Sequence, residues 1–292
     1  MDKSNIVLCW GDSITEGMGM RDKSYPTVLQ NLLGNNYTVI NAGDGGENTV
    51  TIAARQGGLK LFTENEIVFE KGEDTVVIGN QDDNGFISSN DEKIALTALL
   101  GNQLPINDIE ICSEKFTLKL KDFSWTPITY TAVLKRRNSE EIFKIPKGSS
   151  VILNNTDVTV KGGIDVYLMG ANGGFDKSPQ KLVNQFKIMV DYHKSDRFII
   201  VAPFWSPDYD EALEQEFPRH IVNFRKMACE KGLEFEGLVA TEEDLERIAL
   251  GRTPPSLCYK NKPDVHLNEY GYHFLAYLVY EKGKELKLFN QV

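Results

Sequence analysis

Residues 6–10, Ile-Val-Leu-Cys-Trp, form an unbroken apolar run close to the start of the sequence. A strand with apolar side chains on both faces is typical of a parallel sheet that helices cover on both sides. The run leads directly into Gly11-Asp12-Ser13-Ile14-Thr15-Glu16-Gly17. This places a serine at the carboxyl end of a strand and the start of a helix, where backbone N–H groups can stabilise an anion. We therefore interpret Ser13 as a candidate nucleophile.

Strand and helix patterns alternate at both ends of the chain. Apolar residues at helical spacing, proline after an N-cap serine and buried-type apolar runs supply the signals. We expect strands at 37–40, 164–169, 198–202 and 233–239. We expect helices at 25–33, about 49–56, from 178, 211–231 with a break at Pro218, and 268–286. Such alternation predicts a parallel sheet between two helical layers.

Between residues 58 and 162 the helical period largely disappears. Short β-type runs separated by turn clusters replace it, and several alternate with period two, as half-exposed antiparallel strands do. We expect strands at 67–69, 75–78, 109–111, 116–120, 130–134, 151–153 and 158–160, and one helix at 92–100. The sequence thus predicts a discontinuous α/β domain over 1–57 and 163–292, interrupted by an all-β subdomain, a β-sandwich or small barrel, over 58–162.

Composition and net charge limit the classes of molecule that the protein is expected to bind. The 292 residues carry a net charge of −10, which argues against nucleic acid or an anionic membrane surface as the main partner. No segment has the length and apolarity of a membrane span or the pattern of a signal peptide. We expect a cytoplasmic protein, or alternatively a secreted one whose signal has been removed. The cysteines and histidines show no metal-ligand spacing, so no metal site is expected. An organic cofactor is not expected either, because a serine nucleophile with a histidine base needs none.

A histidine near the other end of the sequence is a candidate base for Ser13. His266 lies in Pro263-Asp264-Val265-His266-Leu267, just before the last expected helix. A serine hydroxyl needs a base, and imidazole is the side chain best matched to that task near neutral pH. We expect Asp264 to orient His266, and we interpret Asp12 as a brace for the turn at Ser13.

Two tryptophans stand at expected strand ends. Trp10 closes the first apolar run, and Trp205 follows the strand at 198–202. Pocket walls are typically apolar and aromatic, so both could border a pocket at the sheet edge, with Trp205 the candidate to touch substrate. The alternative is a place in the core, which is the more frequent one for an aromatic side chain beside a buried strand.

The chain resembles the SGNH (GDSL) hydrolase family over about residues 5–57 and 163–285. Gly11-Asp12-Ser13 is similar to the first family block, which implies that Ser13 is the nucleophile. Residues 41–46 are similar to the second block, whose final glycine donates its N–H to the oxyanion, and this implies the same role for Gly46. The resemblance also implies a flavodoxin-like three-layer α/β/α fold with a parallel sheet.

Two further blocks carry the resemblance and also depart from it. Gly170-Ala171-Asn172 is similar to the third block, which implies that the Asn172 amide is an oxyanion donor. His266, followed by Leu-Asn-Glu-Tyr-Gly-Tyr, is similar to the last and implies a general base. Gly173 replaces an aspartate of the usual pattern, and Pro263 stands where the family has its acid. Either Asp264 reaches the imidazole through an adjusted loop, or a backbone carbonyl holds the ring.

The resemblance implies a serine esterase that works through an acyl-enzyme. The oxyanion hole would consist of the Ser13 and Gly46 N–H groups and the Asn172 amide. The sequence shows no long apolar lid, which disfavours a lipase, and we expect short acyl esters, above all acetyl, on a carbohydrate. A thioesterase or lysophospholipase-type acylhydrolase, and a catalytically weak carbohydrate-binding protein on the same scaffold, are the alternatives. The 58–162 region would serve as a carbohydrate-binding or specificity module or as an oligomer interface.

Overall fold

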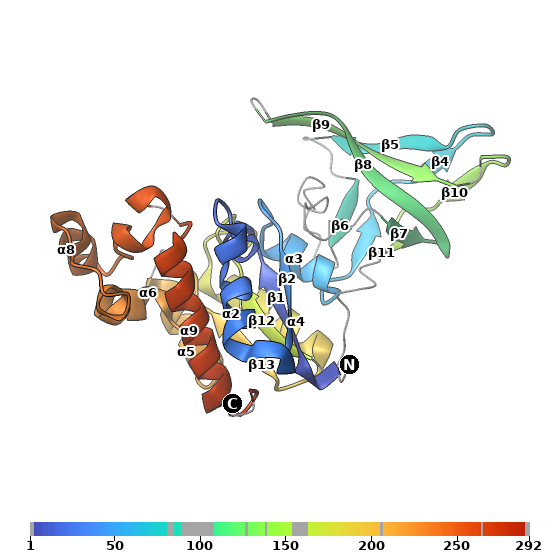
Figure 1. Cartoon of the computed structure of the whole chain (residues 1–292). Coiled ribbons are helices and arrows are strands. Elements are labelled where there is room, and N and C mark those ends of the chain that lie inside the picture. Colours follow the sequence, from blue (N-terminus) through green and yellow to red (C-terminus); the bar gives the residue numbers. More distant parts are fainter. Residues whose placement is uncertain are drawn as a thin grey trace. The chain divides into compact units, whose positions relative to one another are not determined.

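A computed structural model describes residues 3–80, 85–88, 108–125, 128–137, 139–153, 163–204, 207–263 and 265–289. The chain divides into two compact units, which are Met1–Thr49 with Val160–Val292, and Val50–Thr159. Figure 1 labels the helices and strands of both units.

The first unit is built on a five-stranded sheet. Its strands are β1 (Ile6–Gly11), β2 (Thr38–Gly43), β12 (Ile164–Leu168), β13 (Phe198–Val201) and β14 (Ile221–Val222). Every neighbouring pair is parallel, in the order β14-β13-β12-β1-β2. Numbered within this unit alone, the order is 2-1-3-4-5, as in flavodoxin-like sheets. The prediction of a parallel α/β sheet is confirmed.

Helices of the first unit follow the strands. They are α1 (Ser13–Glu16), α2 (Tyr25–Leu33), α4 (Pro179–His193), α5 (Pro207–Glu216), α6 (Phe224–Met227), α7 (Leu233–Phe235), α8 (Glu242–Ala249) and α9 (Glu269–Glu285). A further helix, α3 (Thr49–Gln56), begins at the last residue of the unit's first segment. Ser178 caps α4 by accepting from the Lys181 N–H, and Asn268 caps α9 by accepting from that of Gly271. These caps explain why the two longest helices begin where the sequence predicted.

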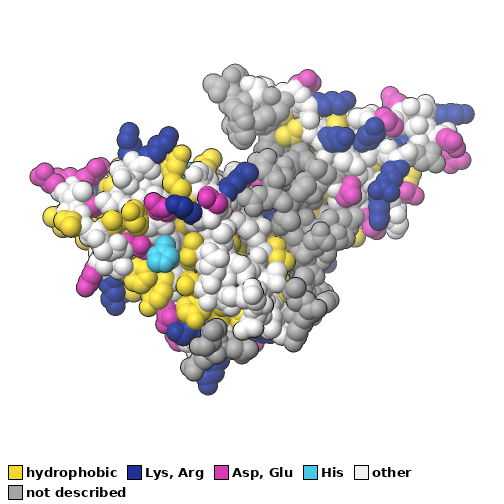
Figure 2. Space-filling view, viewed as in Figure 1, with side chains coloured by type: hydrophobic (Ala, Val, Ile, Leu, Met, Phe, Trp, Pro, Cys, Tyr) yellow, Lys and Arg dark blue, Asp and Glu magenta, His cyan; other side chains and the backbone are white. Residues whose placement is uncertain are grey.

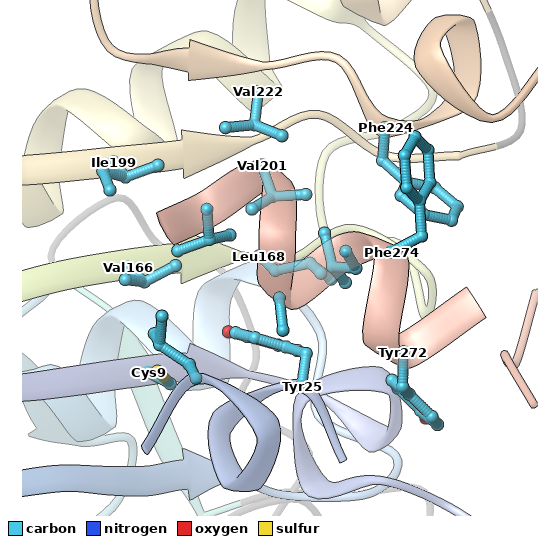
Figure 3. Packing of buried hydrophobic residues seen from close by; sticks show 14 of the residues in the cluster. Cys9, Tyr25, Val166, Leu168, Ile199, Val201, Val222, Phe224, Tyr272 and Phe274 are labelled. Atoms are coloured by element: carbon cyan, nitrogen blue, oxygen red, sulfur yellow. The ribbon is translucent and has the colours of Figure 1, made fainter. Parts of the chain in front are cut away.

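One face of the sheet packs against α2 and α9. Figure 3 shows alternate strand residues, among them Cys9, Val166 and Val201, on the same side as Tyr25 of α2 and Phe274 of α9. All five are buried. In Figure 1, α2 and α9 run side by side over this face. The period-two projection of strand side chains divides the sheet into two different faces.

The opposite face carries a buried polar cluster. Trp10 donates from Nε1 to Oδ1 of Asp165 at 3.0 Å, and His193 at the end of α4 pairs with Oδ2. Trp10 is fully buried, so of the two alternatives for this residue the structure favours a place in the core over a pocket wall. Its side chain projects perpendicular to the sheet, toward the α4 layer, and not along the strand toward the sheet edge.

The region after β13 differs from the prediction. The expected break near Pro218 is present, since α5 ends at Glu216. The expected strand at 233–239 is wrong, because the fifth strand is Ile221–Val222 and Leu233–Phe235 is helical. Pro218 cannot continue a helix, because it lacks an N–H and its ring clashes with the preceding turn. The buried Ile221-Val222 pair then joins the sheet, where the Ala202 N–H donates to the Val222 carbonyl at 3.0 Å.

The second unit is mainly antiparallel β-structure. Its strands are β3 (Leu61–Thr63), β4 (Ile67–Phe69), β5 (Thr75–Asn80), β6 (Phe86–Ser88), β7 (Asp108–Ile111), β8 (Glu114–Trp125), β9 (Ile128–Arg136), β10 (Phe143–Ile145) and β11 (Ser150–Leu153). Seven form a sheet in the order β5-β9-β8-β7-β11-β3-β6, and β10 pairs with β4. The runs predicted near 67, 75, 109, 116, 130 and 151 are strands.

Two predictions for this region lie outside the described residues, the strand at 158–160 and the helix at 92–100. Whether 58–162 forms a sandwich or barrel subdomain with those boundaries stays a prediction.

Candidate active site

Three loops leave the same edge of the first unit's sheet. The Cα partner of Gly11, at the end of β1, is Gly43 in β2 and Leu168 in β12. Because all three strands are parallel, the residues that follow them meet at the carboxyl edge. In a sheet of order 2-1-3-4-5, the chain reverses direction across the sheet between β1 and β12, and crevices for ligands form at such points. The residues after β1 include Ser13.

Ser13 is the first residue of α1, in a tightly constrained turn. Asp12 has extended backbone and its Oδ1 accepts from the Ile14 N–H at 3.0 Å, so it caps the helix. Gly11 admits no side chain, since a Cβ there would lie 2.4 Å from the Leu168 carbonyl oxygen. Together they hold Ser13 at the edge, with 5% of its surface exposed. The interpretation of Asp12 as a brace agrees with this cap.

Ser13 Oγ lies 2.9 Å from Nε2 of His266. The histidine backbone is fixed because the Tyr259 N–H donates to the His266 carbonyl at 2.9 Å. Asn268, two residues later, caps α9 and donates to the Ser256 carbonyl at 2.8 Å. A hydroxyl within hydrogen-bond distance of an imidazole has the geometry that general-base activation requires.

The loops after β2 and β12 are joined to each other. Asn172 donates from Nδ2 to the Glu47 carbonyl at 2.9 Å, and the Thr49 N–H donates to the Gly173 carbonyl at 3.1 Å. The primary amide of Asn172 has a second N–H beyond the one that Glu47 receives. Gly46 has φ +90°, a conformation that favours glycine.

These loops also adjoin the Ser13 turn. A Cβ built on Gly45 would lie 3.7 Å from the Ser13 Cβ. Gly173, where the family pattern has an acid, has φ +77°, which an aspartate would adopt only with strain. Backbone hydrogen bonds from Thr49 to Gly173 and from Gly173 to Gly170 brace this loop. The structure thus brings Ser13 and His266 into contact, and places Gly46 and Asn172 on loops that contact one another.

Burial changes the acidity of Asp12. Its carboxyl is fully buried, and desolvation raises its pKa from the ordinary 3.8 to about 7, although the N–H groups of Ile14 and Ala171 partly oppose the shift. The Ile14 N–H donates to Oδ1, whereas no described group donates to Oδ2 at the distance and angle of a normal hydrogen bond. A neutral carboxyl is therefore compatible with this site near neutral pH.

Glu16 and Asn41 were missed from the sequence. Glu16 is buried, pairs with Arg21, and comes so close to Gly45 that a Cβ there would lie 2.6 Å from Glu16 Oε2. Asn41 Oδ1 accepts from the Gly43 N–H at 2.9 Å and so shapes the end of β2. The only sequence signal was their place inside the first and second blocks, because burial of an acid is a tertiary property.

Asp264 and Trp205 lie outside the described residues. Their expected roles, orienting His266 and contacting substrate, stay predictions. Within the described ranges, no group of three or more His, Cys, Asp or Glu side chains is arranged to hold a metal ion. In the same ranges no helix combines the length and apolarity needed to cross a membrane.

Comparisons with known proteins add little. No protein family model matches the chain, and no curated protein matches it significantly. One solved structure, from Desulfitobacterium hafniense DCB-2, is provisionally described as a lipolytic protein of the G-D-S-L family. The alignment with it covers 95% of this chain and 99% of that chain, at 11% identity and a TM-score of 0.42. Because both values are low, this likeness carries no argument.

Proposed function

We propose that the protein is a serine esterase of the SGNH type, with Ser13 as nucleophile and His266 as general base. The single observation that carries the proposal is the 2.9 Å separation of Ser13 Oγ and His266 Nε2 at the carboxyl edge of a parallel sheet. The neighbouring loops of Gly46 and Asn172 support it, since acyl transfer also needs donors for an oxyanion.

The reaction has two halves. Ser13 Oγ attacks the ester carbonyl carbon and its proton passes to His266 Nε2. The oxyanion accepts from the Ser13 and Gly46 N–H groups and the second N–H of Asn172. The C–O bond to the alcohol breaks as His266 returns the proton to the leaving oxygen. Water, deprotonated by His266, then attacks the acyl-enzyme, and the carboxylic acid leaves Ser13 with its proton restored. Asp264 is the proposed orienting acid.

The proposed substrates are short acyl esters, with acetyl on a carbohydrate alcohol first. Ser13 is shielded and close to loop backbone, with Gly45 behind its Cβ, which favours a small acyl group. Turnover of acetylated xylan, acyl-CoA and a lysophospholipid by the same preparation ranks the ester, thioester and lipid alternatives. Faster turnover of acyl-CoA or lysophospholipid would replace the carbohydrate ester.

Ser13→Ala tests the mechanism directly. We expect p-nitrophenyl acetate hydrolysis to fall roughly 10⁴-fold or more, because the nucleophile acts as a unit with its base. The control is Ser4→Ala, which removes a hydroxyl away from the sheet's carboxyl edge and should leave the rate unchanged. A fluorophosphonate probe should label wild type and not Ser13→Ala. Wild type that neither labels nor turns over ester would instead support the binding-protein alternative.

A further inference from the structure

The second unit contains a cavity of about 480 Å³ within its β-structure. Strands β8, β9 and β10 and the turns beside them supply its walls, which include Lys115, Phe116, Arg136, Arg137, Ile142 and Phe143. A cavity of this size accommodates a small organic ligand. All of its lining residues belong to this unit, so it is separate from the residues of the Ser13 site.

Arg136 is the cation built into this cavity. It is 8% exposed, and its Cα partner on β8 is Phe116. Nε donates to the Glu73 carbonyl at 3.0 Å, and Nη2 donates to the carbonyls of Glu70 and Glu141 at 3.3 and 2.6 Å. The guanidinium also stands 5.1 Å from the centre of the Phe69 ring. Its direction is therefore fixed before any ligand arrives.

Among the residues that the structure describes, no carboxylate pairs with Arg136. In the described part of the chain no acid lies within ion-pair distance of its guanidinium, and Nη1 makes no hydrogen bond. A buried charge without a counterion is costly, so such charges normally have a partner. A planar guanidinium whose Nη1 makes no hydrogen bond is suited to donate to a carboxylate.

The rest of the wall suits a sugar ring bearing that carboxylate. Phe116 and Phe143 form an aromatic pair with ring centres 5.9 Å apart, and Ile142 adds an aliphatic side chain that is 55% exposed. The carboxylates of Glu114 and Glu141 also line the cavity and can accept from hydroxyl groups. On the face shown in Figure 2, Lys and Arg are mixed with Asp and Glu over the described part of this unit.

We propose that this cavity binds an acidic sugar, a uronic acid unit, whose carboxylate pairs with Arg136 and whose apolar ring face packs on Phe143 and Ile142. The lining combines cations for one carboxylate, acids for hydroxyls and an apolar wall. This combination favours a uronic acid over a purely aliphatic or aromatic acid. The proposal does not depend on the esterase mechanism.

The test measures binding of methyl β-D-glucuronide to the full chain by calorimetry, with methyl β-D-glucoside as the matched ligand that lacks only the carboxylate. We expect the glucuronide to bind at least tenfold more tightly, with affinity falling as salt rises. Ser13→Ala should bind it equally well, which separates this site from the esterase. Equal binding of the two sugars, or no binding, would overturn the proposal, and benzoate that binds as tightly as the glucuronide would overturn its sugar part.

Substitutions in the cavity wall test whether the glucuronide binds in this cavity. Ile142→Glu places an anion beside the expected carboxylate and should weaken glucuronide binding at least tenfold. Ile152→Glu is the matched control, because Ile152 is 52% exposed in the same unit and does not line the cavity. Arg137→Gln should weaken binding severalfold. Arg136→Met should abolish it, and if that variant does not fold, Ile142→Glu decides. Unchanged affinity in Ile142→Glu would exclude this cavity as the site.

Discussion

Two histidines of the first unit stand in opposite settings. His266 is half-buried in a loop at the carboxyl edge of the sheet, with its Nε2 on a serine hydroxyl. His193 ends α4, its side chain is 5% exposed, and it pairs with Asp165, which also accepts from Trp10. His193 has the carboxylate partner that a catalytic histidine normally needs, but no hydroxyl of the described residues reaches its Nε2.

The position of a histidine in the fold therefore determines which of these two roles it can take. Loops at a sheet's carboxyl edge can present a side chain to a ligand, whereas the face under a helix excludes one. One imidazole can accept a proton from a neighbouring hydroxyl at the sheet edge, and the other completes a buried hydrogen-bond network. Only the tertiary structure shows which histidine has which role.

The largest expected effect concerns His266. His266→Ala should lower kcat/KM for p-nitrophenyl acetate by roughly 10⁴-fold, because Ser13 loses its base. His273→Ala is the control, since His273 is exposed on α9 and should leave the rate within twofold. If His193→Leu lowered the rate as much as His266→Ala, the assignment of the catalytic base to His266 and not His193 would be contradicted.

Asp12 should make the free energy of unfolding depend on pH. Because burial raises its pKa to about 7, the folded state keeps a proton that the unfolded chain releases near pH 4. The free energy of unfolding therefore falls as pH rises from about 4 to about 7, by at most about 4 kcal/mol.

Asp12→Asn retains an acceptor for the Ile14 N–H and removes the titration. Urea unfolding at pH 5 and pH 8 should show a smaller decline for Asp12→Asn than for wild type, whereas the exposed control Asp22→Asn should follow wild type. Parallel declines in all three proteins would contradict the raised pKa.

Asn172, on the loop after β12, is the proposed side-chain donor to the oxyanion. Asn172→Ala should reduce kcat by about 10²–10³, with little change in KM, because the amide would act on the transition state. It also loses the hydrogen bond to the Glu47 carbonyl, so thermal unfolding must be measured beside activity. A change in KM alone would assign Asn172 to substrate binding.

His193 should affect stability and not chemistry. His193→Leu leaves Asp165 with its Trp10 partner and removes the other, which should cost about 2 kcal/mol in the free energy of unfolding. The rate per folded molecule should match wild type. Denaturant unfolding together with active-site titration by a fluorophosphonate separates the two quantities.

Local patterns predicted much of the first unit. The apolar run at β1, the Ser178-Pro179 start of α4 and the Asn268 cap of α9 are signals contained within a few residues. The same local reasoning was wrong at β14, because a two-residue strand is defined by its neighbour β13 and has almost no pattern of its own.

Local sequence patterns are enough to predict a parallel α/β sheet, a serine just after its first strand, and a histidine just before its last helix. Folding brings these two side chains, 253 positions apart, to 2.9 Å from each other. Folding also pairs His193 with a buried acid, and places Arg136 in the wall of a cavity without a carboxylate partner among the described residues. Such contacts depend on strand order, register and burial, which combine residues from across the chain, whereas periodicity and capping record only what lies within a few residues.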